Sequence, residues 1–437
     1  MASSQFFEAS APGRLDVMGG IADYSGSLVL QMPIREMTKV KVRLRSDNIC
    51  TLESCVDSEE KLFAKINYND YLDNGKVDYE LARKKFKSVP ETSWIAYVIG
   101  CVIVLQKEKQ IDFKGADFII ESDVPLGKGV SSSASLEVAT MKALAKVFTI
   151  SFTGTELPVL AQRVENFIVG APCGLMDQLS SYFGEPGKLL PIVCQPDLIQ
   201  TSIPLPDDVH FLGIDSGVRH SVGGSSYSDV RCAAFMGYTL IAQELGASRK
   251  DISKAIDRND FSQLPFKGYL CNISVSEFEA RWKNKLPPSL SGKDFVSKYG
   301  SSIDRVTSID ETKHYNIMAC VQHPIYENER VDRFMQLLIK TNESTSSSES
   351  TTAAIGELMY QSHESYSSVG LGSDRTDEIV RFAKELSPVI YGAKITGGGS
   401  GGTVCILTRG AEGKESVHRL HLALCAKYKS KLKLFES

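Results

Sequence analysis

Apolar residues recur along the chain at two spacings, and each spacing predicts one kind of element. Alternation over residues 40–44 and short apolar runs at residues 28–32, 118–120 and 404–407 predict strands. After the third of these segments, apolar residues follow the helical spacing, at Leu136, Ala139, Ala143, Leu144, Val147 and Phe148. A longer apolar run at residues 94–105 predicts a buried helix, since it is too short to span a bilayer. The chain is therefore expected to contain both strands and helices.

A loop rich in glycine and serine joins the predicted strand at residues 118–120 to the helix that follows. It reads Pro-Leu-Gly-Lys-Gly-Val-Ser-Ser-Ser-Ala over residues 125–134. Gly127 and Gly129 let the backbone come close to an anion, and the free N–H groups and dipole of the helix favour negative charge. Serine hydroxyls at this point can cap the helix, contact phosphate or bind a metal ion. The loop predicts a phosphate-binding turn, and the alternative is a well-capped surface helix.

Length and composition indicate more than one structural unit. With 437 residues, 42% of them hydrophobic, the chain can bury large cores and is expected to form two or three units. Several prolines and short apolar pieces at residues 191–206 favour a boundary there. We therefore predict an N-terminal domain over residues 1–203 and a C-terminal domain over residues 204–437.

Charge and cysteine usage exclude some classes of partner. A net charge of −4 argues against nucleic acid as the main partner. The ten cysteines include no Cys-x-x-Cys pair, so reduced thiols are expected and a zinc site is not. The N-terminus has no basic segment followed by an apolar core, which predicts a cytoplasmic protein without a membrane anchor.

Three further segments carry side chains suited to chemistry. The turn-rich residues 11–26 hold Arg14, which could neutralise charge on a transferred phosphoryl group, and Asp23, which could accept hydrogen bonds from sugar hydroxyls. The alternative for this segment is an Arg–Asp ion pair that fixes a loop.

In the second segment, Glu165 at a helix end and Asp177 at the start of the next element flank a Pro/Gly break. One carboxylate would hold Mg²⁺, and the other would orient or deprotonate a hydroxyl. Alternatively, Glu165 is a solvated helix residue and Asp177 a helix cap. The third segment, residues 394–403, has five glycines and could pack against a ligand or another loop, unless it is simply a flexible hairpin.

In order and spacing, the four segments resemble the GHMP small-molecule kinases, which are named for galactokinase, homoserine kinase, mevalonate kinase and phosphomevalonate kinase. The resemblance spans residues 11–407, and Pro-Cys-Gly-Leu-Met-Asp-Gln at residues 172–178 is particularly galactokinase-like. It implies an α+β protein with the two-domain GHMP kinase fold. The N-terminal α/β domain would be related to a ribosomal-protein fold, and the C-terminal α+β domain would be ferredoxin-like.

The resemblance also implies a role for each matching residue, with ATP and Mg²⁺ as cofactors. Asp177 matches the carboxylate that faces the anomeric hydroxyl of a sugar, and Arg14 matches the arginine beside it. Ser133 and Glu165 match the Mg²⁺ ligands. The residues that match or are assigned to nucleotide contacts are Gly127, Gly129, Ser131, Ser132, Ser133 and Gly398. The residues that match sugar contacts are Arg14, Asp23, Gly174, Asp177 and Tyr227.

At one point the chain departs from the galactokinase pattern Gly-Glu-His-Thr-Asp-Tyr. It reads Gly-Gly-Ile-Ala-Asp-Tyr over residues 19–24, so that Gly20 and Ile21 replace two polar residues of the sugar pocket. A buried sugar hydroxyl without a partner costs about 1–3 kcal/mol, which disfavours the hydroxymethyl group of galactose. A pentose has no such group.

Two segments, at residues 14–34 and 359–374, are similar to those of L-arabinokinases. We therefore expect an enzyme that converts the monosaccharide L-arabinose and ATP to L-arabinose 1-phosphate and ADP. The alternatives within this class are galactokinase, galacturonokinase and D-arabinose or fucose kinases. A non-catalytic sugar sensor is the alternative from another class, although the intact serine loop favours an enzyme.

Overall fold

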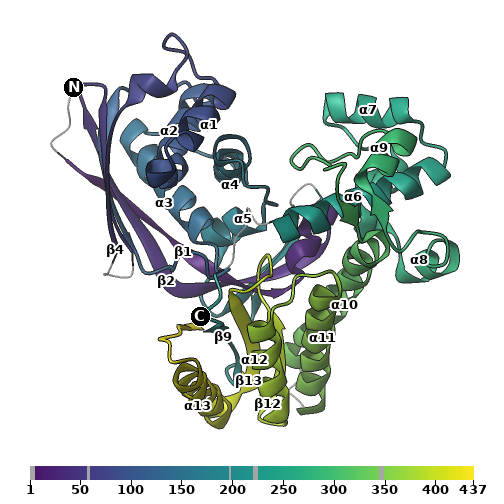
Figure 1. Ribbon diagram of the computed structural model, residues 1–437. Coiled ribbons are helices and arrows are strands. Elements are labelled where there is room, and N and C mark those ends of the chain that lie inside the picture. The colour runs from purple at the N-terminus through teal and green to yellow at the C-terminus, as the bar shows by residue number, and fades with distance from the viewer. Residues whose placement is uncertain (1–4, 57–59, 196–197, 220–224, 344–348) are drawn as a thin grey trace. The chain divides into compact units, whose positions relative to one another are not determined.

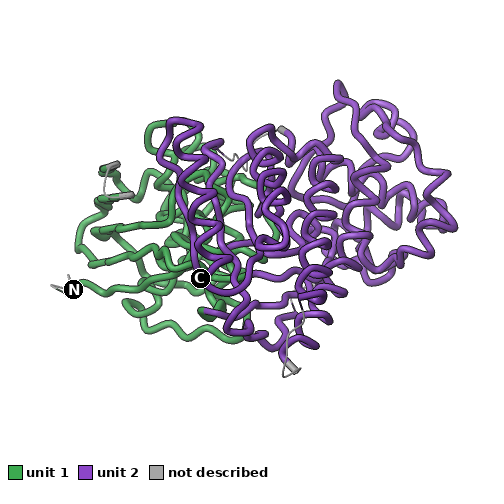
Figure 2. Tube along the Cα trace, turned by 90° about the horizontal axis from the view of Figure 1, so that it is seen from below, with its two compact units in different colours: residues 1–14, 32–186, 437 green, residues 15–31, 187–436 purple. Residues whose placement is uncertain are grey.

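The computed structural model describes residues 5–56, 60–195, 198–219, 225–343 and 349–437. The chain folds as two compact units, coloured separately in Figure 2. Unit 1 comprises residues 1–14 and 32–186 together with Ser437, and unit 2 comprises residues 15–31 and 187–436. None of the helices in these described ranges has the length and apolar content that a bilayer-spanning helix needs.

The sheet of unit 1 has the strand order β4-β3-β5-β2. Strand β3 runs parallel to β5, while the β3–β4 and β2–β5 pairs are antiparallel. The strands are β1 (Phe7–Met18), which pairs with β2, β2 (Leu28–Arg45), β3 (Ile49–Val56), β4 (Glu60–Asn67) and β5 (Gly115–Ser122). Residues 38–45 of β2 form the pair with β5.

Helices cover one face of this sheet, as Figure 1 shows. They are α1 (Tyr79–Lys87), α2 (Ala96–Glu108), α3 (Ser132–Phe148), α4 (Glu156–Arg163) and α5 (Met176–Phe183), with short helical turns η2 (Tyr68–Tyr71), η3 (Pro90–Ile95) and η4 (Val164–Val169). Helix α2 is buried along most of its length, as its apolar sequence predicts, and it packs against α3 in the core of unit 1. This core fixes the start of α3, where the serine loop ends.

Unit 2 contains an antiparallel sheet with the order β12-β13-β9-β14. Its strands are β9 (Val209–Asp215), β12 (Ile390–Ile395), β13 (Thr403–Arg409) and β14 (Leu434–Glu436). Helices α11 (Glu349–Ser368), α12 (Asp374–Glu385) and α13 (Gly410–Tyr428) pack against it (Figure 1). Residues 28–31 of β2 pair with β6 (Lys188–Val193), which also pairs with β7 (Leu198–Ile199) and β8 (Ile203–Pro204).

The rest of unit 2 is mainly helical. It consists of η1 (Gly20–Ser25), α6 (Ser225–Glu244), α7 (Arg249–Arg258), η5 (Pro265–Gly268), η6 (Leu270–Asn272), α8 (Val275–Arg281), α9 (Gly292–Tyr299), α10 (Ile317–Glu343) and the short strands β10 (Leu290–Ser291) and β11 (His314–Tyr315). An apolar core built largely from α6, α10 and the residues around η1 holds this part together. Helices α10 and α11 pack against each other.

Two features differ from the expected elements. Residues 28–32 and 40–44 belong to one continuous strand, β2. The pattern suggests two strands because the polar residues at 35–36 interrupt it, although the backbone stays extended there. Much of the segment predicted to be turn-rich lies in strand β1, and only Gly20–Ser25 forms a short helix. The chain passes from one compact unit to the other at residues 14/15, 31/32 and 186/187. The two units therefore divide the chain differently from the predicted domains at 1–203 and 204–437. The boundary at 203/204 stays a prediction.

Candidate functional site

The serine loop of unit 1 connects β5 to α3. Gly127 and Gly129 have φ angles of 69° and 70°, values that glycine adopts without strain. Ser131 caps α3 with a φ of 59°, and its buried Oγ has no hydrogen-bond partner among the described residues. The first N–H groups of a helix have no partner within the helix. The loop therefore presents backbone and hydroxyl donors suited to an anion.

Arg14, near the middle of β1, binds this loop. Its backbone N–H donates to the carbonyl of Val130 at 3.1 Å, and its Nη1 donates to the carbonyl of Gly129 at 2.7 Å. The strand can come this close because residue 13 is glycine: a Cβ there would lie 2.7 Å from the carbonyl oxygen of Val130. Arg14 is 2% exposed, so its charge is held in place by protein contacts.

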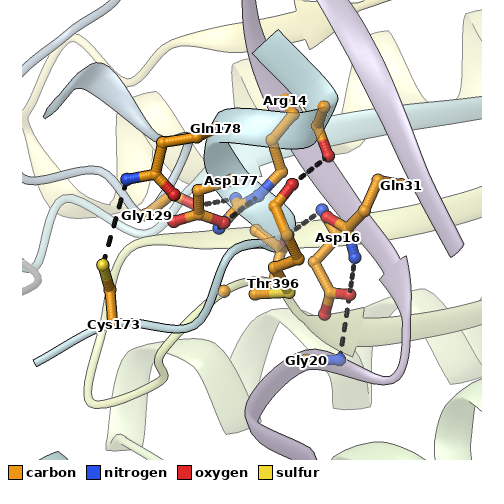
Figure 3. Close-up of polar contacts among 12 residues, drawn as sticks. Arg14, Asp16, Gly20, Gln31, Gly129, Cys173, Asp177, Gln178 and Thr396 are labelled. Carbon is orange, nitrogen blue, oxygen red and sulfur yellow. Dashed lines mark hydrogen bonds and ion pairs between the residues drawn. The ribbon is translucent and has the colours of Figure 1, made fainter. Parts of the chain in front are cut away.

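Asp177 is the second residue of α5 and lies against Arg14, as Figure 3 shows. Its Oδ1 accepts hydrogen bonds from Arg14 Nε at 3.0 Å and Nη2 at 2.7 Å. The other oxygen, Oδ2, accepts none from the part of the chain that is described, and the side chain is 21% exposed. One oxygen of Asp177 is thus fixed, and the other can accept a hydrogen bond from a substrate hydroxyl.

Glu165 lies in the π-helical turn η4, which follows α4. Its backbone carbonyl accepts from the N–H groups of Gly170 and Ala171, at 2.8 and 3.0 Å, and Gly170 ends the turn with a φ of 80°. Such turns recur at functional sites. The Ser133 side chain lies close enough to the Glu165 carboxylate to oppose the rise of its pKa, so the two predicted metal ligands are neighbours. Burial, with the nearby charge of Asp177, raises the pKa of Glu165 to about 7.

Two residues behind Glu165 were missed by the sequence analysis, Glu137 and Gln178. Gln178 Nε2 donates to Glu165 Oε2 at 2.9 Å and to Glu137 Oε2 at 3.2 Å, and it also approaches the sulfur of Cys173 (Figure 3). Glu137 is fully buried, its Oε1 has no partner in the described ranges, and burial raises its pKa well above the usual value. The sequence does contain a signal for Glu137, because it lies one helical turn after Ser133 and so on the same face of α3.

These side chains fit a divalent cation, although they do not form a closed protein cage. Within the described residues, no group of three or more His, Cys, Asp or Glu side chains is arranged to hold a metal ion. Mg²⁺ is usually bound by one or two carboxylates, with phosphate oxygens and waters as the remaining ligands. Ser133 and Glu165 fit this donor set. Two buried carboxylates that lack a Lys or Arg partner in this part of unit 1 favour a cation further.

Gly174 lies in the loop that leads into α5, three residues before Asp177, and is partly exposed. Unit 1 thus contains Arg14, Asp177, Ser133, Glu165 and the serine loop as one connected set, with Gly174 close in the chain to Asp177. The other predicted site residues, Asp23, Tyr227 and Gly398, belong to unit 2.

In unit 2, Asp23 and Tyr227 both contact Tyr24, Asp23 at its backbone and Tyr227 at its ring. Asp23 Oδ1 accepts from the N–H of Tyr24 at 2.7 Å, and the rings of Tyr24 and Tyr227 meet edge to face with centroids 6.2 Å apart. Arg231 lies 5.5 Å from the centre of the Tyr24 ring and forms a buried ion pair with Asp304. Ile21 belongs to the same apolar cluster and is 1% exposed. Arg231 was not singled out from the sequence because its partner is 73 residues away.

Gly398 lies in the glycine-rich loop between β12 and β13 of unit 2. Backbone hydrogen bonds hold this loop: Ser400 N–H donates to the carbonyl of Leu371 at 2.6 Å, and Gly402 N–H donates to that of Val218 at 3.0 Å. The hydroxyl of Tyr366 donates to the carbonyl of Gly397 at 2.9 Å. These contacts are those of a fixed loop, not of a free hairpin end.

Comparison with known protein families gives two matches. Residues 96–185 match the GHMP kinases N terminal domain, and residues 346–430 match the GHMP kinases C terminal domain. The chain is 40% identical to an L-arabinokinase of Arabidopsis thaliana over 93% of its own length, and it spans 43% of the length of that relative. It is also 29% identical to a galactokinase of Chloroflexus aggregans, over 94% of this chain and 85% of the relative.

Solved structures agree on the fold. A galactokinase of Lactococcus lactis in complex with galactose superposes with a TM-score of 0.69 at 21% identity, covering 99% of this chain and 93% of that one. A mevalonate kinase of Methanococcus jannaschii gives a TM-score of 0.54 at 15% identity, with coverage of 99% and 98%. The expected two-domain α+β fold is confirmed by these likenesses. The chain belongs to the GHMP kinase family.

Proposed function

We propose that the chain is a sugar 1-kinase that transfers the γ-phosphoryl group of ATP to the anomeric hydroxyl of L-arabinose. The observation that carries the phosphoryl-transfer proposal is the position of Arg14. Its buried guanidinium contacts both the backbone of the serine loop, at Gly129, and the carboxylate of Asp177. A phosphate site and a hydroxyl acceptor are thereby joined through one fixed positive charge.

The chemical step needs no covalent enzyme intermediate. The anomeric oxygen forms a bond to the γ-phosphorus while the bond from that phosphorus to the β,γ-bridging oxygen breaks, and ADP leaves with the electron pair. The hydroxyl proton passes to Oδ2 of Asp177 and then to solvent. Because the transition state of phosphoryl transfer is loose, Asp177 acts chiefly by orienting the hydroxyl. Arg14 stabilises the charge on the transferring group.

The remaining residues of unit 1 bind the nucleotide in this proposal. Gly127, Gly129, Ser131 and Ser132 contact the phosphates, and Gly398 of unit 2 is kept as a proposed nucleotide contact. Ser133 and Glu165 would hold Mg²⁺, which supplies neutralisation of phosphate charge when it is bound.

The choice of L-arabinose rests on Gly20 and Ile21, together with the similarity to an L-arabinokinase. Ile21 is buried in an apolar cluster and offers no side-chain hydrogen bond to a hydroxymethyl group. Asp23, Gly174 and Tyr227 are the proposed sugar contacts. Galactose is the second candidate, because galactokinases are similar over most of this chain.

A coupled assay of ADP formation tests both parts of the proposal. The protein is given Mg²⁺ and ATP with L-arabinose, galactose, galacturonate, D-fucose, D-arabinose or glucuronate in turn. We expect kcat/KM to be highest for L-arabinose, by about tenfold or more over galactose. A preference for galactose would contradict the substrate assignment alone. Binding of sugar and ATP without turnover would instead indicate a sensor and contradict the kinase assignment.

A further inference from the structure

The phenol of Tyr366, on α11, connects two loops of unit 2. Its side chain is fully buried. The hydroxyl accepts a hydrogen bond from the backbone N–H of Ile21 at 2.9 Å and donates one to the carbonyl of Gly397 at 2.9 Å. A single hydroxyl therefore joins the turn at Gly20 and Ile21 to the glycine-rich loop.

The same phenol fills the space beside Gly20. A Cβ on residue 20 would lie 1.5 Å from the hydroxyl oxygen of Tyr366 and 2.7 Å from its Cζ, far closer than atoms can approach. Gly20 also has a φ of 38°, in the region that favours glycine. While Tyr366 is present, residue 20 can carry no side chain, so this turn cannot offer a polar group from that position.

Side chains from several elements hold the backbone of this turn. The N–H of Gly20 donates to Asp16 Oδ1 at 3.0 Å (Figure 3), and that of Gly19 donates to Glu327 Oε1 at 3.3 Å. With the bond from Ile21 to Tyr366, three successive N–H groups have side-chain acceptors. Asp16 is itself fixed by the buried Lys394, at 2.7 Å. The position of Ile21 is therefore set by its surroundings and not by the loop alone.

We propose that Tyr366 is a specificity-determining positioning residue: with Gly20 it fixes the turn so that the sugar site takes pentopyranoses and disfavours sugars with a substituent on C5. The inference rests on the proposed function and assigns its substrate class to a particular pair of residues. Burial and the nearby charges of Asp16 and Glu327 raise the pKa of the Tyr366 hydroxyl well above its usual value. The phenol thus stays neutral and keeps its proton for the bond to Gly397.

The first test removes only the hydroxyl, in Tyr366→Phe. Loss of both hydrogen bonds should loosen the turn and lower kcat/KM for L-arabinose by about tenfold, mainly through KM. Use of galactose should fall less, so the ratio of the two kcat/KM values should narrow by about fivefold. The matched control is Tyr360→Phe, on the same helix, because the buried Tyr360 hydroxyl has no partner in the described chain.

The second test concerns the space beside Gly20. Gly20→Ala alone should collide with Tyr366 and lower kcat/KM for L-arabinose by more than about tenfold. In Gly20→Ala with Tyr366→Leu, the two nearest colliding atoms are gone while Asp16 Oδ2 stays 2.9 Å from the new Cβ, so part of that loss should be recovered. Thermal unfolding of all variants identifies any that fail to fold. If the double variant is no more active than Gly20→Ala, the steric pairing is wrong.

Failure of this inference can be distinguished from failure of the proposed function. If the wild-type protein turns over no sugar, the kinase assignment fails. The ratio of the binding affinities for L-arabinose and galactose, measured by calorimetry, then replaces the ratio of the kcat/KM values. An unchanged ratio in Tyr366→Phe, in either assay, overturns the role of Tyr366. A wild-type preference for galactose contradicts the L-arabinose assignment whatever the variants do.

Discussion

Two sets of buried carboxylates, one in each unit, differ in whether a cationic side chain compensates their charge. In unit 1, Glu137 and Glu165 share the amide of Gln178, and neither has a Lys or Arg partner among the described residues. In unit 2, Asp16 is paired with Lys394 at 2.7 Å and Asp304 with Arg231 at 2.9 Å, all four side chains being buried.

The pKa directions follow this difference in charge balance. Burial raises the pKa of Glu137 and Glu165, whereas Arg231 holds the pKa of the Asp304 carboxyl below its usual range despite burial. A buried anion without a partner is costly, and functional sites tolerate such costs when a ligand benefits. The unit 1 cluster is thus suited to receiving a cation, while the unit 2 pairs are suited to fixing a loop.

Asp177 offers the largest effect, since it has an arginine partner, unlike Glu137 and Glu165, and lies where the substrate hydroxyl is proposed to bind. Asp177→Ala should lower turnover by about a thousandfold, because the proposed hydroxyl acceptor is lost. Binding of ATP, measured by calorimetry, should change little. Full activity in this variant would show that Asp177 does not act on the substrate.

Removing the cation from the buried ion pair of Asp16 and Lys394 should give the largest change in the free energy of unfolding. Lys394→Met leaves Asp16 buried without its cation and should lower the free energy of unfolding by about 3–5 kcal/mol. The double variant with Asp16→Asn removes both charges and should recover most of that loss. Urea unfolding of the wild type, the two single variants and the double variant measures this. Additive losses would mean that the charges of the pair are not coupled.

Removing a buried carboxylate that has no Lys or Arg partner in the described chain should change the free energy of unfolding in the opposite direction. Glu137→Gln should raise the free energy of unfolding at neutral pH by about 1 kcal/mol, because the buried side chain no longer carries an ionisable group. The native pKa of Glu137 is raised, so its cost is absent below the unfolded pKa of about 4.3 and grows as the pH rises above it. Urea unfolding between pH 4 and 7.5 should therefore show a difference that shrinks toward pH 4. A loss of stability at every pH would contradict this view.

The smallest effect concerns the cation itself. With a nonhydrolysable ATP analogue present, Mg²⁺ should raise the melting temperature by about 2–4 °C over the same sample with EDTA. Glu165→Gln should abolish most of this shift. Asp304→Asn, in unit 2, is the control: it lowers stability but should leave the Mg²⁺ shift intact. An equal shift in Glu165→Gln would assign the metal elsewhere.

The sequence predicts the local parts of the site better than the distant ones. The serine loop and the break before Asp177 were readable because their residues are adjacent and their chemistry depends on turns and helix ends. Asp16 and Lys394 are 378 positions apart, and no pattern within either segment points to the other. Glu137 looked like an ordinary helix residue, because a single sequence shows neither that the surrounding face of α3 is buried nor that Gln178 faces it.

Strand β2 shows a similar limit at the level of the fold. Apolar alternation stops in its middle, at residues 35–36, and the pattern alone divides it in two. In the structure, β2 is one extended strand that pairs with a different strand at each end. It pairs with β6 over residues 28–31 and with β5 over residues 38–45. Such pairing is long-range information, which local spacing does not carry.

The three backbone amides at residues 19–21 have a practical consequence for anyone who wishes to redirect this protein to another sugar. Their anchors come from β1, α10 and α11, so an exchange at residue 20 alone meets an obstacle that lies 346 positions further along the chain. A mutant library that varies one position at a time would score every replacement there as inactive. Useful variants should emerge only when both members of the pair are randomised together.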